Sequence, residues 1–376
     1  MRTLDEFARH KQGEIGVQKL LRRLRHVPAG LLNFCSNDYL ALSQDRRLIE
    51  AACMAGQRYG TGAGASRLVT GNHLLYEQLE STIAALKGTE AALVFGSGYL
   101  ANIGVIPALV GERDLILADE LSHACMMSGA KLSGARVLVF KHNDVAHLSS
   151  LLAKHRSTAE HCLVMTEGVF SMDGDMAPLA ALDRVTKEFG GWLLTDDAHG
   201  LGVVGSGRGS AAHWHVKPDL QMGTLSKSVG SYGGYVATSQ VVNEFLINRS
   251  RSLIYATGLP PAVVAASISG LQIIAQDLEL CALPMRNAKL FSSLLGLQEP
   301  QSAIVPLIVG AADLALAASE LLEREGYVVT AIRPPTVPNG TARLRFTFTA
   351  QHARHDIERL AGTVKRLVLP MMAPEK

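Results

Sequence analysis

The sequence GTLSKSVGSYGGY (residues 223–235) places Lys227 in a turn built from glycines and hydroxyl side chains. A second stretch, TDDAHG (residues 195–200), follows an apolar run upstream and carries two adjacent carboxylates and His199. Surface lysines usually lie on helices or among other charges, so the setting of Lys227 indicates a chemical role for its amine. The two stretches together decide the interpretation of the chain.

Pyridoxal phosphate requires a lysine that forms a Schiff base and an acidic partner for its pyridine nitrogen. Lys227 supplies the first group, and Asp196 or Asp197 supplies the second. Alone, residues 195–200 are equally consistent with a strand that ends in capping carboxylates. Their spacing to Lys227 favours the cofactor site, where His199 could hydrogen-bond the phenolic oxygen of the cofactor.

Short apolar runs alternate with helical patterns through the middle of the chain. The runs cover residues 93–96, 115–118, 137–140, 163–166 and 192–195, and helices are expected at 145–155 and 179–189. This alternation predicts an α/β fold with a parallel sheet covered on both faces. Ligands bind such sheets at the carboxyl ends of the strands. The polar residues Ser97, His123, Glu167, Asp196 and Lys227 come at those ends.

The outer parts of the chain follow other patterns. An amphipathic helix is expected over residues 1–27, stopped by Pro28 and Gly30, and a short strand over 33–40. A long helix should begin at Pro261 and end near Asp277. Strands at 304–309, 328–332 and 344–348, with helices at 314–325 and 355–367, predict a second α/β region. We expect an N-terminal helix and arm (1–45), a large domain (46–285) and a small C-terminal domain (286–376).

A glycine turn and several basic residues complete the candidate site. In FGSGYLAN (residues 95–102), Gly98 opens a helix whose free N–H groups suit a phosphate. On its own this stretch is better explained as a plain helix cap, and the other motifs favour the phosphate site. Thr224 and Ser226 could add hydroxyl donors, and His123 could stack on a pyridine ring. The glycines of residues 60–64 lack the strand–turn–helix setting of a dinucleotide site.

Two arginine groups could bind carboxylates. The cluster KLLRRLRH (residues 19–26) is either a solvated helix face or a contact for an acidic carrier or substrate carboxylate. In RPPTVPNGTARLR (residues 333–345), Arg343 and Arg345 lie on one side of a strand. One of these two could bind a substrate carboxylate.

Composition limits the partners and the compartment. The chain has 376 residues, of which 48% are hydrophobic, and a formal net charge of +2. This charge gives no reason to expect a nucleic-acid partner. The five scattered cysteines lack metal-ligand spacing and suit a reducing cytoplasm. The N-terminus is too polar for a signal peptide, and no apolar run is long enough to span a membrane, so a soluble cytoplasmic protein without a metal is expected.

The chain resembles the α-oxoamine synthases, a branch of the fold-type I pyridoxal-phosphate enzymes. The resemblance runs nearly end to end and is carried by SNDYL (36–40), TEGVFSMDGD (166–175), DDAHG (196–200) and TLSK (224–227). It implies a large domain with a mostly parallel sheet flanked by helices and a small C-terminal α/β domain. It also implies a homodimer with the site at the subunit interface.

The resemblance assigns roles residue by residue. Lys227 is the Schiff-base lysine, Asp196 pairs with the pyridine nitrogen, and His199 contacts the ring oxygen. The other implied cofactor residues are His123 on the ring, Gly98, Tyr99 and Thr224 at the phosphate, Ser171 in the pocket, and Thr257 reaching the partner's phosphate. Asn37 and Arg345 would hold the amino-acid carboxylate, and Arg22 and Thr336 would contact the acyl substrate.

Within this branch, the chain is most similar to members that condense L-alanine with a pimeloyl thioester to give 8-amino-7-oxononanoate and CO2 for biotin synthesis. The thioester could be on acyl carrier protein or coenzyme A. A branch member that uses glycine and acetyl-CoA would share every cofactor residue. A non-catalytic binding protein on this scaffold is a remote alternative, since it would be expected to lack Lys227 or Asp196.

Overall fold

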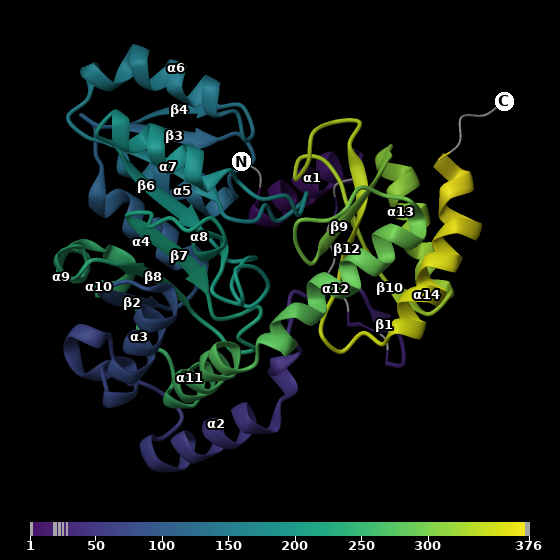
Figure 1. Cartoon of the computed structure of the whole chain (residues 1–376), viewed down its shortest axis with the longest axis horizontal. Coiled ribbons are helices and arrows are strands. Elements are labelled where there is room, and N and C mark those ends of the chain that lie inside the picture. Colours follow the sequence, from purple (N-terminus) through teal and green to yellow (C-terminus); the bar gives the residue numbers. More distant parts are fainter. Residues whose placement is uncertain (1–2, 18–20, 22–23, 25, 28, 373–376) are drawn as a thin grey trace. The chain divides into compact units, whose positions relative to one another are not determined.

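The computed structural model describes residues 3–17, 21, 24, 26–27 and 29–372 and divides into two compact units, Met1–Leu32 and Asn33–Lys376. In the first unit, α1 (Leu4–Val17) has no buried residue (Figure 1). The predicted helix over residues 1–27 is too long, because Leu21, Leu24 and His26 are not helical. A helix that buries no face gains little from packing and is marginal at this length.

The centre of the second unit is a seven-stranded sheet in the order β2-β8-β7-β6-β5-β3-β4. Its strands are β2 (Ala91–Phe95), β3 (Leu115–Asp119), β4 (Arg136–Phe140), β5 (Cys162–Glu167), β6 (Trp192–Asp196), β7 (Leu220–Thr224) and β8 (Gly234–Thr238). Only β8 runs antiparallel to its neighbours, so the expected mostly parallel sheet is confirmed. Strands β7 and β8 were not predicted, because the glycines and threonines in LQMGT and GYVAT weaken the apolar signal.

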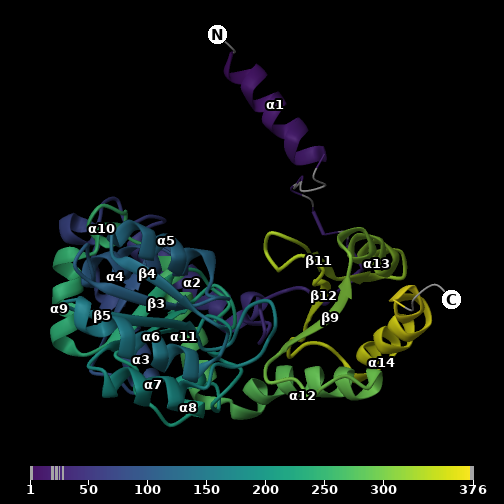
Figure 2. The same ribbon diagram turned by 90° about the horizontal axis from the view of Figure 1, so that it is seen from above.

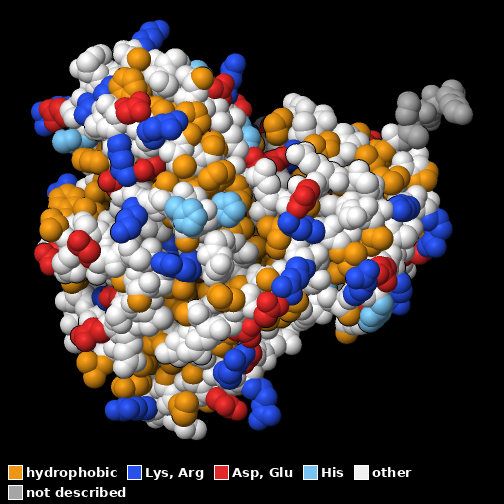
Figure 3. Space-filling view, viewed as in Figure 1, with side chains coloured by type: hydrophobic (Ala, Val, Ile, Leu, Met, Phe, Trp, Pro, Cys, Tyr) orange, Lys and Arg blue, Asp and Glu red, His pale blue; other side chains and the backbone are white. Residues whose placement is uncertain are grey.

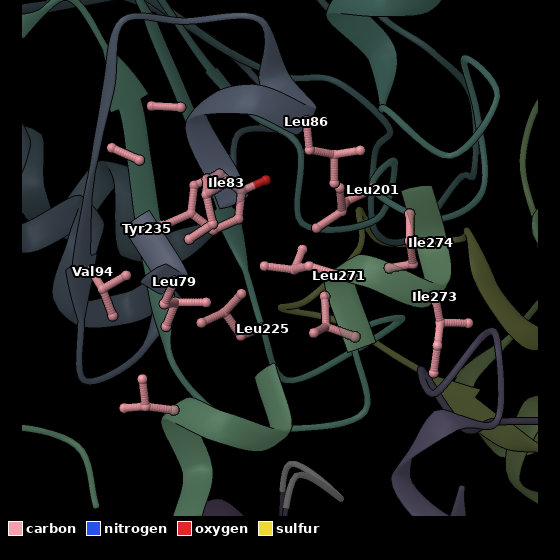
Figure 4. Close-up of a cluster of buried hydrophobic side chains, with 14 of the residues drawn as sticks. Leu79, Ile83, Leu86, Val94, Leu201, Leu225, Tyr235, Leu271, Ile273 and Ile274 are labelled. Carbon is pink, nitrogen blue, oxygen red and sulfur yellow. The ribbon is translucent and has the colours of Figure 1, made fainter. Parts of the chain in front are cut away.

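Helices cover both faces of this sheet (Figure 1). The helices of this part of the chain are α2 (Arg46–Tyr59), α3 (Leu74–Lys87), α4 (Gly98–Leu109), α5 (Ala124–Ser133), α6 (Val145–His155), α7 (Leu179–Glu188), α8 (Ser210–His213), α9 (Gln240–Arg249), α10 (Arg251–Ile254) and α11 (Pro261–Gln276). Of these, α2 packs chiefly on α11, and α10 packs on α4. Alternate strand residues face opposite sides: Leu93 packs with α4 and α5, whereas Val94 packs with α3 and α11. Figure 4 shows the second cluster, in which Leu79, Leu225 and Leu271 meet.

A smaller antiparallel sheet has the order β11-β12-β9. It contains β9 (Ile304–Gly310), β11 (Thr330–Ile332) and β12 (Ala342–Thr347). The short strand β10 (Tyr327–Val328) directly precedes β11 but is not part of this sheet. Helix α13 (Ala312–Arg324) packs on this sheet, and α12 (Leu278–Leu295) packs on α14 (Arg354–Thr363), as Figure 2 shows. The predicted strand over 328–332 is thus two short strands. The boundaries proposed for three domains stay a prediction.

Residues 33–40 form turns instead of the predicted strand, with only β1 (Leu32–Asn33) extended. Side chains hold these turns: Asn33 Oδ1 accepts from Cys35 N at 2.9 Å, and Ser36 Oγ accepts from Asp38 N at 3.1 Å. Such local bonds compete with a strand ladder. They leave Tyr39 fully buried below the site described next.

No single charge dominates the face of the molecule seen in Figure 3. On the face seen in Figure 3, basic and acidic side chains are interspersed among scattered apolar ones. Within the described ranges, no single helix has the length and apolar composition of a membrane span. Helices α11 and α12 reach that composition only as a pair bent by 80°.

Candidate active site

The candidate site lies where β5, β6 and β7 end. Glu167 and Asp196 are the last residues of β5 and β6 and occupy paired positions in the sheet. Lys227 follows β7 in the turn that leads to β8. Side chains at the carboxyl ends of adjacent parallel strands converge, so the sequence places these three groups together because of the topology.

The amine of Lys227 contacts a histidine. Its Nζ lies 2.7 Å from His199 Nε2. Burial lowers the pKa of Lys227 to about 8, against the opposing effects of Asp196 and Glu167. Burial, aided by the charge of Lys227, also holds the pKa of His199 well below its usual value. A neutral His199 can therefore accept a hydrogen bond from Lys227.

Asp196 is a buried carboxylate held by amide donors. Asn102 Nδ2 donates to Oδ2 at 3.0 Å, and the backbone N–H of Ala198 donates to Oδ1 at 3.0 Å. Burial raises the pKa of Asp196, and the charge of Lys227 opposes that shift. Among the residues that the structure describes, Asp196 forms no ion pair within 4 Å. A buried carboxylate in this state suits a cationic ligand.

The neighbouring Asp197 has a different role. Its carboxylate forms an ion pair with Lys87 at 2.8 Å, and both side chains are only 1% exposed. The same carboxylate accepts from the backbone N–H of Ser210. Asp197 therefore anchors the long loop after β6, and Asp196 alone faces the site.

A chain of hydrogen bonds leads away from Lys227 through His199. The hydroxyl of Tyr39 lies 2.7 Å from His199 Nδ1 and 3.3 Å from Asn37 Oδ1. The guanidinium of Arg345 donates to the same Asn37 oxygen at 3.3 Å. Arg345 also donates from Nε to the backbone oxygen of Ser171. The expected carboxylate-binding pair, Asn37 and Arg345, is thus connected to the lysine.

The glycine turn after β2 lies beside the end of β7. A Cβ atom at Gly98 would lie 3.5 Å from Cβ of Thr224, so the two expected phosphate residues are adjacent. The hydroxyl of Ser97 caps α4 by accepting from Leu100 N at 3.1 Å. Thr224 Oγ1 lies 2.8 Å from Ser226 Oγ. Free N–H groups at the helix start and these hydroxyls have the arrangement predicted for an anion site.

His123 caps α5 and has an exposed side chain. Its Nδ1 accepts from Cys125 N at 3.2 Å and lies 2.9 Å from Cys125 Sγ. The same sulfur accepts from Asn102 Nδ2 at 3.1 Å. A network therefore joins the histidine to the amide that holds Asp196.

A cavity of about 800 Å³ opens beside His123. We call it the acyl cavity, after the acyl substrate that the family resemblance assigns to Thr336. Its lining includes Leu121, His123, His142, Phe170, Ser171, Met172, Asp173, Pro335, Thr336, Val337, Pro338 and Arg343. Arg343 is paired with Asp173. His142 lies 3.0 Å from Asp119 and 2.7 Å from Asp175. Burial opposes the charge of His142, but these carboxylates raise the pKa of its imidazole to about 10.

The structure brings most of the predicted site residues together. Contacts join Lys227, His199, Asn37, Arg345 and Ser171 in one group. Tyr99 is half-exposed, with its hydroxyl 3.3 Å from Ser128 Oγ. Thr336 lines the acyl cavity. Thr257 is exposed and forms a β-bridge with Ser66, while Arg22 lies outside the described residues.

Sequence reasoning gave no role to Tyr39, Glu167, Asn102 or Cys125. Glu167 is buried, and its Oε2 accepts from Ser171 N at 3.1 Å. Burial, followed by the charge of Asp196, raises its pKa well above the usual value. A signal existed for Asn102, because it is an amide in the otherwise apolar helix GYLANIGVIPAL. Tyr39 and Glu167 lie in quoted motifs, whereas Cys125 lies in none. The contacts of Tyr39 with His199 and of Cys125 with Asn102 join segments that are distant in the sequence.

These groups fit the expected cofactor. A lysine whose pKa is about 8 is neutral often enough to condense with an aldehyde. Asp196 is the acidic partner that a pyridine nitrogen needs, and the turn at Gly98 and Thr224 suits a phosphate.

Comparisons with known proteins identify the family of the chain. The model of the family described as aminotransferase class I and II matches residues 29–364. The 8-amino-7-oxononanoate synthase of Beijerinckia indica is 50% identical, over 98% of this chain and 99% of its own length. The structure of serine palmitoyltransferase from S. paucimobilis with a bound PLP–myriocin aldimine has a TM-score of 0.90 at 27% identity, covering 98% of this chain and 99% of that one. That of 8-amino-7-oxononanoate synthase from Francisella tularensis has a TM-score of 0.80 at 27% identity, covering 92% and 100%.

Proposed function

Because the chain belongs to the aminotransferase class I and II family, and within it to the α-oxoamine synthases, we propose that it is a pyridoxal-phosphate enzyme that makes 8-amino-7-oxononanoate. It condenses L-alanine with a pimeloyl thioester and releases CO2 and the free carrier, in biotin synthesis. The observation that carries the proposal is the contact of the partly buried Lys227 with the buried His199, close to the buried Asp196 and beside the acyl cavity.

The cofactor is pyridoxal phosphate, which when bound supplies a cationic ring that accepts electrons from the α-carbon of the amino acid. Lys227 would hold it covalently, Asp196 would lie at the pyridine nitrogen, and His199 at the phenolic oxygen. The turn of Gly98 and Tyr99, with Thr224, would bind the phosphate. Ser171 lies against the pocket through its backbone contact with Arg345.

Lys227 would act as the base in the first half of the reaction. Its free amine would remove the α-proton of the bound alanine. A pKa of about 8 allows this at neutral pH, where an ordinary lysine remains protonated. Arg345 and Asn37 would bind the alanine carboxylate and so orient the Cα–H bond toward Lys227.

His123 and the acyl cavity would serve the second half. The carbon nucleophile attacks the thioester carbonyl, and the carrier leaves as a free thiol. The β-keto acid then loses its carboxylate as CO2, and a proton returned to the α-carbon completes the amino ketone. Thr336 and the Pro-fixed turn 333–341 would contact the acyl chain, with Arg22 as a further candidate. We propose that acyl carrier protein or coenzyme A serves as the carrier.

A homodimer is part of the proposal. Large apolar side chains remain exposed on the described chain, including Leu68 (54%), Val69 (73%), Leu74 (65%) and Tyr255 (71%). Such residues favour burial against another subunit. Thr257, two residues after Tyr255, is exposed and could reach the phosphate site of a second copy.

Product analysis tests the function. Purified protein with pyridoxal phosphate, L-alanine and pimeloyl thioester should give 8-amino-7-oxononanoate, CO2 and free thiol in equal amounts. Glycine with acetyl-CoA is the control pair. A product from that pair alone would assign the chain to another α-oxoamine synthase. If neither pair gave a product, the remaining hypothesis would be a non-catalytic binding protein on this scaffold.

A further inference from the structure

A hydrogen-bonded bridge connects two residues that approach the cofactor from different elements. Asp196 ends β6, and His123 precedes α5. Between them lie Asn102, in α4, and Cys125, in the first turn of α5. Both bridging side chains are buried, at 0% and 4% exposure. Neither has a role in the reaction as described so far.

The orientation of the Asn102 amide is fixed by its contacts. Its Nδ2 lies 3.0 Å from Asp196 Oδ2 and 3.1 Å from Cys125 Sγ. A carboxylate oxygen can only accept, so the nitrogen of the amide must face Asp196. The two hydrogens of one NH2 group are thus shared between the carboxylate and the sulfur.

The protonation of His123 follows from its neighbours. Nδ1 accepts the backbone N–H of Cys125 at 3.2 Å, so Nδ1 carries no proton. The sulfur of Cys125 lies 2.9 Å from the same nitrogen. Burial raises the pKa of the Cys125 thiol to about 12, so the thiol keeps its hydrogen and donates it to Nδ1. The ring proton then resides on Nε2, available to the cavity that His123 lines.

We propose that Asn102 and Cys125 are positioning residues, whose bridge fixes Asp196 for the pyridine nitrogen and holds His123 with its proton on Nε2. This inference rests on the proposed function. It makes His123 a hydrogen-bond donor to the acyl substrate or to the alanine carboxylate. It also makes the position of the histidine depend on the same amide that holds Asp196.

The tautomer can be observed directly in the loaded full-length enzyme. Imidazole ¹⁵N spectra, with His123 assigned through a His123→Gln variant, should show an unprotonated Nδ1 and a protonated Nε2. A proton on Nδ1 would overturn the inference. This measurement needs no cysteine variant, so it remains decisive even if one of them fails to fold.

Cofactor affinity tests the bridge. Titration of each variant with pyridoxal phosphate should show Cys125→Ala binding about threefold to tenfold more weakly, as expected for one lost hydrogen bond. Cys125→Ser, which keeps a donor, should stay within about twofold of wild type, and Asn102→Ala should weaken binding by at least about tenfold. Cys162→Ala is the matched control, since Cys162 is buried in β5 and its sulfur makes no hydrogen bond to the described residues.

The outcomes separate the two proposals. A wild-type protein that does not bind pyridoxal phosphate would refute the proposed function. A wild type that binds while Cys125→Ala binds equally well would refute the bridge alone. Equal losses in Cys125→Ala and Cys125→Ser would also refute it, because volume and not hydrogen bonding would then matter.

Discussion

The site around Lys227 and the acyl cavity beside it differ in the polarity of their side chains. Around Lys227, buried polar groups bond to one another: His199 to the lysine and to Tyr39, and Asn102 to Asp196. The acyl cavity has apolar walls, among them Phe170 and Val337. Its described cations, Arg343 and His142, are already paired with carboxylates.

This difference suggests that the site around Lys227 carries out the reaction, whereas the acyl cavity selects the acyl substrate. Buried polar networks are costly unless every member is satisfied, so the groups around Lys227 tolerate little change. A largely apolar wall tolerates substitutions of similar volume. We therefore expect changes near the lysine to abolish the reaction and changes in the cavity to alter which acyl group is accepted.

The largest effect should come from Lys227→Ala. Turnover should fall by more than about 10⁴-fold, because this variant loses both the covalent anchor and the base. Borohydride reduction of the wild type followed by peptide mapping should label Lys227. Lys187→Ala, which removes a half-exposed amine paired with Asp183, should retain activity. A label on another lysine would contradict the assignment.

Asp196→Asn should slow proton removal from alanine by roughly a thousandfold or more, a loss of about 4 kcal/mol or more in transition-state stabilisation. An amide cannot hold the pyridine nitrogen protonated by charge. Deuterium exchange at the alanine α-carbon measures this step. The adjacent Asp197→Asn should instead destabilise the fold by about 3–5 kcal/mol, because Lys87 would be left buried without its partner. Exchange at the wild-type rate in Asp196→Asn would show that its role is wrong.

The acyl cavity should give a smaller effect that depends on the substrate. Pimeloyl thioester should exceed heptanoyl thioester in kcat/KM by about tenfold to a hundredfold, the range expected for a charge-assisted bond to the distal carboxylate. Thr336→Val should lower that preference by about twofold to tenfold while leaving heptanoyl turnover near wild type. Equal kcat/KM values for the two thioesters in the wild type would remove the distinction between the two regions.

The smallest effect should be on stability alone. The pKa of His142 is raised to about 10, so its contribution is full below its ordinary pKa near 6.5 and is lost as the pH rises toward 10. The slope should not exceed about 1.4 kcal/mol per pH unit. Urea unfolding between pH 7 and 10 should show this decline in wild type and a flatter profile in His142→Gln. Parallel profiles would mean that His142 is uncharged.

The sequence predicted the reactive groups at the strand ends better than the residues that line the acyl cavity. Asp196 comes at the end of a predicted strand, and residues at such ends converge in a parallel sheet. The strand β7 before Lys227 was not predicted, so Lys227 was assigned to the site from its motif and its spacing to Asp196. Tyr39 was out of reach because its segment looked like a strand, while side-chain bonds fold it into turns. The acyl cavity depends on residues 170–173 meeting residues 335–343 across the two sheets, which no local pattern encodes.

Strand β2 has a single neighbour in its sheet, the late strand β8, which pairs Phe95 with Gly234. During synthesis on a ribosome, β8 therefore becomes available to pair with β2 only on the order of ten seconds after β2 has been made. The turn at Gly98 packs closely against Gly234, since a Cβ at Gly234 would lie 2.4 Å from the backbone of Ser97. This turn can therefore be completed only after β8 has been made. We therefore expect the turn at Gly98 to be among the last parts of this sheet to form, after Lys227 has been made.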